Sequence, residues 1–403
     1  KSNSIKMHSY SFLFFSALGL KLGFCSNPNK HQRLLAYSDW NELTSNAGWD
    51  TRYNHAGVVL NNKVFILGGI SNLGTTFNDV WSSEDGATWT QVTSGAAWSI
   101  RQGPQAVVLN NKIFVMGGSK GVSYYNDVWS SEDGATWTRL TYGADWAARN
   151  SFSSVIHNNE IFIMGGYAGT SKVNDVWSSA DGITWSQVTS GASWSARRDH
   201  SSVVYDSKIW VMGGLDNSAS VNDVWSSADG ASWTRLTAGA DWGGRATHAN
   251  VVYDNKVWVM GGTNTVNSNI NDVWWSTDGG NWNELISASG WTNRKGPAVV
   301  VLGENLLVMG GQATPTLSET DVWDMFVPGD PTGQPTTQPS SEPTSQPTSQ
   351  PTIDLSFKKH LKDQLDDIRD DASNILGGVQ TGLTGLLRSV RNVVLPRRHG
   401  NDL

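Results

Sequence analysis

The chain contains 403 residues, and its 29 basic and 36 acidic side chains give a formal charge of −7. This negative balance argues against a general nucleic-acid binder, because such proteins need a positive surface to displace counterions from phosphates. A single cysteine, Cys25, excludes a disulfide scaffold, a Cys-ligated zinc module and an iron–sulfur site.

The first segment, residues 1–26, has the pattern of a secretory signal peptide. Residues 10–20 form an uncharged apolar run, which is shorter than the roughly 20 residues of a membrane-spanning helix. The small residues Gly23 and Cys25 suit a cleavage site that follows such a run. We therefore expect a secreted, extracellular protein; a short N-terminal anchor is the alternative.

The middle of the chain is one unit repeated six times. Six tryptophans lie 49, 48, 48, 48 and 49 residues apart, and an arginine follows each of them after three residues. The tryptophans are Trp49, Trp98, Trp146, Trp194, Trp242 and Trp291, and the arginines are Arg52, Arg101, Arg149, Arg197, Arg245 and Arg294.

Each unit predicts four short antiparallel strands. An apolar strand leads to a two-residue turn such as Asn61-Asn62, whose residue types tolerate a positive φ. A second apolar strand ends in Gly-Gly, and a variable loop leads to Asp-Val-Trp. A Ser-rich strand, an Asp-Gly hairpin and a strand that begins near a further Trp complete the unit. A four-stranded sheet repeated about every 48 residues indicates an all-β fold, a six-bladed β-propeller.

These features resemble the kelch-repeat family, with its Gly-Gly after the second strand and its two spaced tryptophans. The resemblance covers residues 37–327. It extends to the central propeller domains of galactose-oxidase-like proteins. One position departs from it, because serine, as at Ser83, stands where kelch repeats usually have tyrosine before the last hairpin. That hairpin also resembles a shortened Asp-box of sialidase-type propellers, which describes a turn and implies no chemistry.

The tryptophans also predict how the ring closes. The outer-strand tryptophan is missing after Trp323, but residues 38–43 match an outer strand and contain Trp40. We expect this N-terminal strand to complete the sixth blade, which leaves no free edge at the seam.

The candidate binding face carries the six arginines and six variable loops. The loops span residues 70–77, 119–125, 167–173, 215–221, 263–270 and 312–320. The arginines could bind a carboxylate or sulfate; alternatively, each could pair with the aspartate of its own Asp-Val-Trp. Further ligand-binding candidates are His55, His200 and His248, three residues after their arginines, and the loop tyrosines Tyr124 and Tyr167. We expect no bound metal and no cofactor.

Non-catalytic recognition of an extracellular protein or glycan is the favoured function. The alternative is a carbohydrate-active enzyme, either a kelch-like sugar epimerase or a sialidase-like hydrolase. Galactose-oxidase chemistry is excluded, because its Cys–Tyr crosslink would need a cysteine outside the signal region. A sialidase-like site would need a Tyr–Glu pair, and no such pairing is evident in the sequence.

Two further segments follow the propeller. Residues 328–352, rich in Pro, Thr, Ser and Gln, predict an extended linker. Residues 353–403 predict an amphipathic helical tail, with apolar residues three and four apart from Leu361 to Ile375 and arginines near its end. The tail could dock to a membrane surface or a partner, or simply pack loosely or oligomerise. The oligomeric state is left open.

Overall fold

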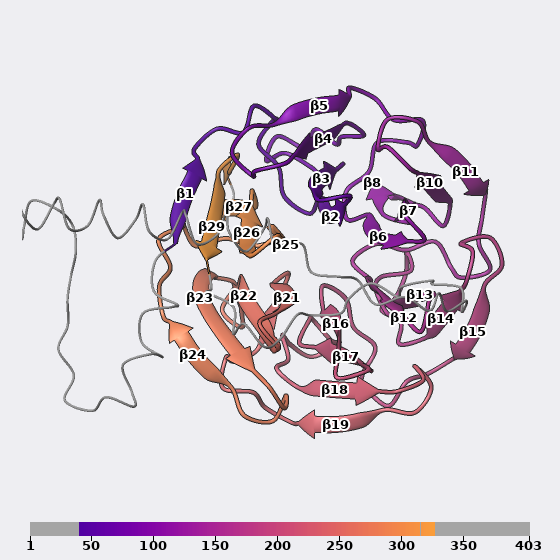
Figure 1. Cartoon of the computed structure of the whole chain (residues 1–403). Coiled ribbons are helices and arrows are strands. Elements are labelled where there is room, and N and C mark those ends of the chain that lie inside the picture. Colours follow the sequence, from indigo (N-terminus) through magenta and orange to yellow (C-terminus); the bar gives the residue numbers. More distant parts are fainter. Residues whose placement is uncertain (1–39, 315, 327–403) are drawn as a thin grey trace, which may run out of the picture. The chain divides into compact units, whose positions relative to one another are not determined.

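The computed structural model describes residues 40–314 and 316–326. In this part of the chain, six four-stranded antiparallel sheets form the blades of a ring (Figure 1). This confirms the predicted six-bladed propeller. The predicted signal peptide, the linker and the helical tail lie outside the described residues, as do the exact ends of the predicted propeller at Tyr37 and Val327.

The blades follow one another along the chain, and in each the first strand is innermost. Blade 1 contains β2 (Ala56–Leu60), β3 (Lys63–Leu67), β4 (Val80–Ser83) and β5 (Thr90–Thr93). Blade 2 contains β6 (Gln105–Leu109), β7 (Lys112–Met116), β10 (Val128–Ser131) and β11 (Thr138–Thr141). Blade 3 contains β12 (Ser153–His157), β13 (Glu160–Met164), β14 (Val176–Ser179) and β15 (Ser186–Thr189).

The second half of the ring repeats this plan. Blade 4 contains β16 (Ser201–Tyr205), β17 (Lys208–Met212), β18 (Val224–Ser227) and β19 (Thr234–Thr237). Blade 5 contains β21 (Ala249–Tyr253), β22 (Lys256–Asn264), β23 (Asn269–Ser276) and β24 (Asn283–Ile286), with the short β20 (Arg245–Ala246) beside β22. Blade 6 contains β25 (Ala298–Leu302), β26 (Asn305–Met309), β29 (Val322–Phe326) and β1 (Asn41–Thr44). Loop ribbons add β8 (Ser119–Lys120), β9 (Ser123–Tyr124), β27 (Gln312–Thr314) and β28 (Leu317–Ser318).

The two ends of the propeller sequence meet in blade 6. β1 pairs with β29, and Asn41 lies opposite Asp324. Figure 1 shows β1 as the outer strand beside β29. The N-terminal strand therefore closes the ring as the tryptophan pattern predicts.

The tight turns have the predicted geometry. Asn61 and Asn62 join β2 to β3 with φ of 50° and 58°, which is the conformation of a two-residue turn that matches the twist of the strands. Such turns keep one face of the propeller, the hairpin face, short and uniform. The opposite face, the loop face, carries the variable loops between the second and third strands.

Tryptophans make up much of the packing between strands. In blade 1, Trp49 is 2% exposed and meets the edge of Trp89 at a centroid distance of 6.0 Å. All six blades repeat this contact, and in blade 6 the partners are Trp291 and Trp40. Edge-on aromatic pairs contribute beyond the apolar area they bury, so the tryptophan excess is mainly structural.

Candidate functional site

The six arginines on the loop face are buried, and each is held by the same bidentate aspartate pair and the same Gly-Gly carbonyl. In blade 1, the terminal amino groups of Arg52 donate to both carboxylate oxygens of Asp79, at 2.7 and 2.8 Å. Arg52 also donates to the carbonyl of Gly68, the first glycine of Gly-Gly, and its Nε donates to the carbonyl of Asp50. The same oxygen of Asp79 that accepts from the guanidinium Nη2 accepts from Trp81 Nε1.

The other five blades repeat this bidentate pair. The pairs are Arg101–Asp127, Arg149–Asp175, Arg197–Asp223, Arg245–Asp272 and Arg294–Asp321. All six arginine side chains are at most 1% exposed. This geometry supports a structural role for the six arginines. The N–H groups of each guanidinium donate hydrogen bonds within their own blade, and the guanidinium presents almost no surface to a ligand.

The ion pairs also set the ionisation of the acids. Burial by itself would raise the pKa of Asp127, but the hydrogen bonds and charge of Arg101 outweigh it and hold that pKa below its ordinary value. Asp223 behaves in the same way beside Arg197. Both carboxylates therefore stay charged within the network.

The Gly-Gly step leaves room for the next chain segment. Gly69 has a φ of 100°, and a Cβ at this position would lie 2.8 Å from the Cβ of His55. Neither the backbone angle nor the space admits a side chain. Glycine here lets the entry to the first strand pack directly on the end of the second.

The three candidate histidines are buried between blades. His200 lies 2.9 Å from the hydroxyl of Ser153, and His248 lies 2.7 Å from that of Ser201. Burial, with a smaller contribution from the neighbouring arginine, lowers the pKa of each of the three to about 3. They are neutral at physiological pH, and this contact with the preceding blade gives two of them a packing role.

His55 differs from the other two histidines. Both of its ring nitrogens are buried and lack a hydrogen-bond partner among residues 40–314 and 316–326. Ser153 and Ser201 are the first residues of their inner strands, and the corresponding residue of blade 6 is Ala298. Alanine has no hydroxyl, so His55 alone among the three candidate histidines lacks this hydrogen bond in the described part of the chain.

A ring of backbone hydrogen bonds surrounds the propeller axis on the loop face. Its members lie two residues after the arginines and all have φ between 50° and 59°. They are Asn54, Gly103, Ser151, Asp199, Thr247 and Gly296. Five N–H groups donate to the corresponding carbonyl of the preceding blade, for example Asp199 to Ser151 at 2.9 Å. The backbone of the loop face is therefore fixed close to the axis.

The positions between the arginines and this backbone ring form a second ring, here called the variable ring. It comprises Tyr53, Gln102, Asn150, Arg198, Ala246 and Lys295. Their backbones pair with the start of the adjacent loop in each blade. The sequence analysis does not single out these residues. A comparison of the six repeats would have found them, because this position holds a different residue in every repeat and directly follows the arginine that all six share.

The two candidate tyrosines lie together, and one of them lies beside a residue of the variable ring. The rings of Tyr124, from blade 2, and Tyr167, from blade 3, lie 5.9 Å apart. The guanidinium carbon of Arg198, from blade 4, lies 5.6 Å from the centroid of Tyr167. All three side chains are half-exposed. Three blades thus combine an aromatic surface with an accessible cation.

Large apolar side chains stand exposed on the loop face. The loop residues Leu73 and Val122 are each 94% exposed, Val266 is 74% exposed and Leu317 is 50% exposed. They belong to blades 1, 2, 5 and 6, which are consecutive around the ring. Large apolar side chains exposed on neighbouring loops of one face indicate a candidate protein-interaction surface.

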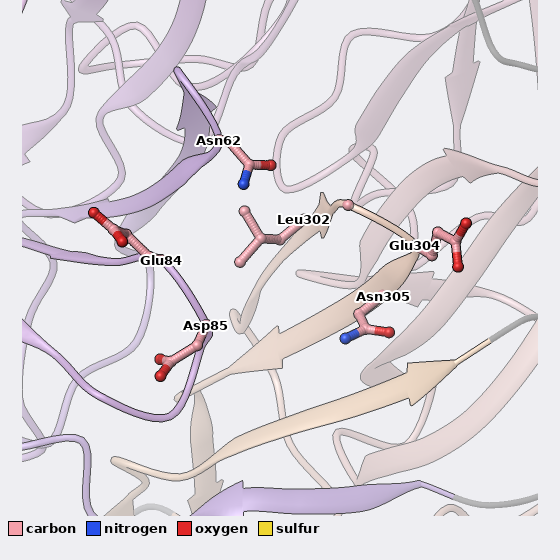
Figure 2. A pocket seen from close by; sticks show the side chains of 7 residues that line it. Asn62, Glu84, Asp85, Leu302, Glu304 and Asn305 are labelled. Carbon is pink, nitrogen blue, oxygen red and sulfur yellow. The ribbon is translucent and has the colours of Figure 1, made fainter. Parts of the chain in front are cut away.

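The hairpin face has a shallow hollow between blades 1 and 6, with a volume of about 500 Å³. Figure 2 shows the carboxylates of Glu84 and Glu304 on opposite sides of Leu302, pointing away from each other. Glu84 pairs with Lys63, and Asp85 accepts backbone hydrogen bonds within its own turn. The acids therefore do not converge on a common point.

A family model matches most of the propeller sequence. The model described as the KLHDC2/KLHL20/DRC7 Kelch-repeats domain matches residues 33–166, 99–241 and 131–311. The chain belongs to the kelch-repeat family. The search of curated proteins finds no match. Kelch propellers generally mediate protein interactions, and this kelch propeller has a variable loop face.

Two structural features bear on the enzymatic alternatives for this kelch propeller. Within the described ranges, no group of three or more His, Cys, Asp or Glu side chains could hold a metal ion. The tyrosines of the loop face make no hydrogen bond to a glutamate in the part of the chain that the structure describes, so the pair that a sialidase-like site needs is not seen. A search of the described residues also finds no helix long and apolar enough to cross a membrane.

Proposed function

We propose that this kelch propeller is a secreted interaction module that recognises an extracellular partner through its loop face. The observation that carries the proposal is the set of exposed apolar loop residues, Leu73, Val122, Val266 and Leu317. Extracellular location rests on the signal-peptide pattern of residues 1–26. A protein partner is favoured over a neutral glycan for this part of the face, because aliphatic side chains offer apolar area and few hydrogen bonds.

Three of the four loops that carry these residues are tied to one another before any partner binds. Asn269 donates to the carbonyl groups of Gln312 and Ala313, which ties the loop of blade 5 to that of blade 6. Gln312 and Ser318 then donate to the side chain of Asn72 in blade 1. Loops held in place in this way lose less conformational entropy on binding.

The test uses the purified full chain as a probe on an array of extracellular proteins. We expect it to bind one or more of them, and a variant with Leu73, Val122, Val266 and Leu317 all replaced by serine should bind at least tenfold more weakly. Ile183→Ser is the matched control, since Ile183 is 51% exposed on the hairpin face. Equal weakening by both variants, or no effect of the fourfold replacement, would refute the loop-face assignment.

Secretion is tested separately by expressing the natural chain in a secreting eukaryotic cell. The proposal expects the protein in the medium without residues 1–26. Retention inside the cell with this segment intact would contradict the extracellular assignment without touching the loop-face result.

A further inference from the structure

Arg198 differs from the six arginines that hold the blades together. It directly follows Arg197, yet its side chain is 39% exposed. Its one ion pair in the described part of the chain is a contact of 3.4 Å between Nε and Asp199. Its two terminal amino groups make no hydrogen bond among residues 40–314 and 316–326, so they are available to a ligand.

The tyrosines beside Arg198 form an open aromatic surface. Tyr124 lies against Gly169 in the loop of blade 3, where a Cβ would be 3.5 Å from the tyrosine ring. A side chain at that position would cover part of the Tyr124 ring, and glycine leaves it clear. Aromatic faces of this kind stack on the C–H face of a sugar ring or on other flat apolar groups.

Two lysines add positive charge at the same place. Lys172 and Lys295 act, together with Arg198, on the carboxylate of Asp199. Lys172 also donates to the backbone carbonyl of Asp216 in the loop of blade 4. The carboxylate of Asp216 is itself occupied by the N–H groups of Ser218 and Ala219 and by the hydroxyl of Ser195.

This local charge opposes the charge of the propeller as a whole. Residues 38–327 contain 16 basic and 27 acidic side chains, a balance of −11. Six of the 16 basic residues are the buried arginines, which leaves ten, and three of those ten lie near enough to Asp199 to act on its carboxylate. The three cations outnumber the carboxylate of Asp199 beside them, so an anion that is repelled by most of the surface is attracted to this position.

We propose that Tyr124, Tyr167 and Arg198, with Lys172 and Lys295, form a subsite for an acidic sugar unit of a glycan. The tyrosines contact the C–H face of the sugar ring, and the guanidinium binds its carboxylate or sulfate through paired N–H donors. An acidic sugar combines a flat apolar face and an anion in one residue. The subsite uses none of the four exposed apolar residues, although Tyr124 and Val122 share the loop ribbon of blade 2, and the proposal does not depend on the role of those four residues.

The experiment is titration calorimetry of the full chain with three probes of equal length. The probes are an oligogalacturonate, a sulfated galactan fragment and a neutral galactan fragment. We expect at least one acidic probe to bind at least tenfold more tightly than the neutral one. The carboxylated and sulfated arms identify which anion the subsite prefers.

Variants then test the residues. Arg198→Ala and Tyr167→Ala should each weaken binding of the acidic probe at least tenfold, while Tyr167→Phe should retain it. Arg235→Ala is the matched control. Arg235 is exposed on the outer strand β19, and its guanidinium carbon likewise lies 5.6 Å from an aromatic ring, that of Trp225 on β18. Thermal melting verifies that each variant is folded.

Four outcomes would overturn the proposal. The first three are no preference for acidic probes, no effect of Arg198→Ala on a folded protein, and equal loss of binding in Arg235→Ala. The fourth comes from a further titration with an acidic peptide: binding that matches the best glycan and is lost in Arg198→Ala. The last would assign the subsite to protein carboxylates. None of these results depends on the fourfold loop variant, so failure of the subsite and failure of the protein-recognition proposal are distinguishable.

Discussion

Trp40 packs edge-on against Trp291, with ring centroids 5.9 Å apart and an interplanar angle of 86°. The two residues come from opposite ends of the propeller sequence, and their contact joins the N-terminal strand to blade 6. Trp49 and Trp89 make the same contact, at 6.0 Å and 81°, but they lie within one uninterrupted repeat of the chain. The closure of the ring thus repeats a contact that every other blade makes locally.

Replacing Trp40 by alanine tests this closure. We expect the free energy of unfolding to fall by about 2–4 kcal/mol, near the range measured for large aromatic truncations, in chemical denaturation. Trp89→Ala is the matched control. Hydrogen exchange in β29 should accelerate in Trp40→Ala and not in Trp89→Ala, since only the first loosens β1. Unchanged stability and exchange in Trp40→Ala would show that the N-terminal strand does not secure the ring.

The arginine networks predict a large effect on stability. Arg149→Ala leaves the carboxylate of Asp175 buried beside a cavity, so we expect a loss of about 3–5 kcal/mol, measured by denaturant unfolding. Arg235→Ala, at an exposed arginine on an outer strand, should change stability by less than about 0.5 kcal/mol. If Arg149→Ala instead preserves stability and weakens ligand binding, the ligand-binding interpretation of the arginines is the right one.

The unpartnered His55 can be given the hydrogen bond that its counterparts have. Ala298→Ser places a hydroxyl where Ser153 and Ser201 meet His200 and His248. We expect stability to rise by about 0.5–1.5 kcal/mol, the usual net value of one hydrogen bond, in thermal and denaturant unfolding. Ser201→Ala should have the opposite effect. A decrease in stability for both variants would mean that the serine hydroxyl does not fit at this seam.

The buried carboxyl of Asp324, in the sheet of blade 6, should make the stability of the protein depend on pH. It is 7% exposed, its Oδ1 has no partner among the described residues, and burial raises its pKa despite a hydrogen bond with Asn41. Because the folded pKa is above the unfolded one, ionised Asp324 destabilises the fold at pH 7, and this cost disappears as the pH falls below the unfolded pKa.

Serine occupies the corresponding position in four other blades, at Ser82, Ser130, Ser178 and Ser226. Asp324→Ser should therefore raise stability by about 1–2 kcal/mol at pH 7 and by much less near pH 3, measured as melting curves across this range. An exposed aspartate, Asp206, replaced by serine provides the comparison. An advantage of Asp324→Ser that does not change with pH would rule out ionisation of this carboxyl as its cause.

The sequence by itself determines the blade number, the strand positions and the closing strand. Each follows from a local pattern that recurs, such as the Trp and Arg three residues apart or the Asn61-Asn62 turn. A hairpin depends on residues within about ten positions of each other, so the repetition of the hairpins is visible in the sequence. Trp40 could be assigned to blade 6 because it fills a vacancy in a column of outer tryptophans.

Only the tertiary structure decides which side chains remain available to a ligand. The sequence leaves open whether Arg149 binds a ligand, because its pairing with Asp175, 26 positions away, depends on how two strands and a loop are arranged. The same arrangement buries Arg197 and exposes its neighbour Arg198. Tyr124, Tyr167 and Arg198 come from three blades, and they lie close together because packing around the axis brings separate loops together. The spacing of the repeats in the sequence does not show this arrangement.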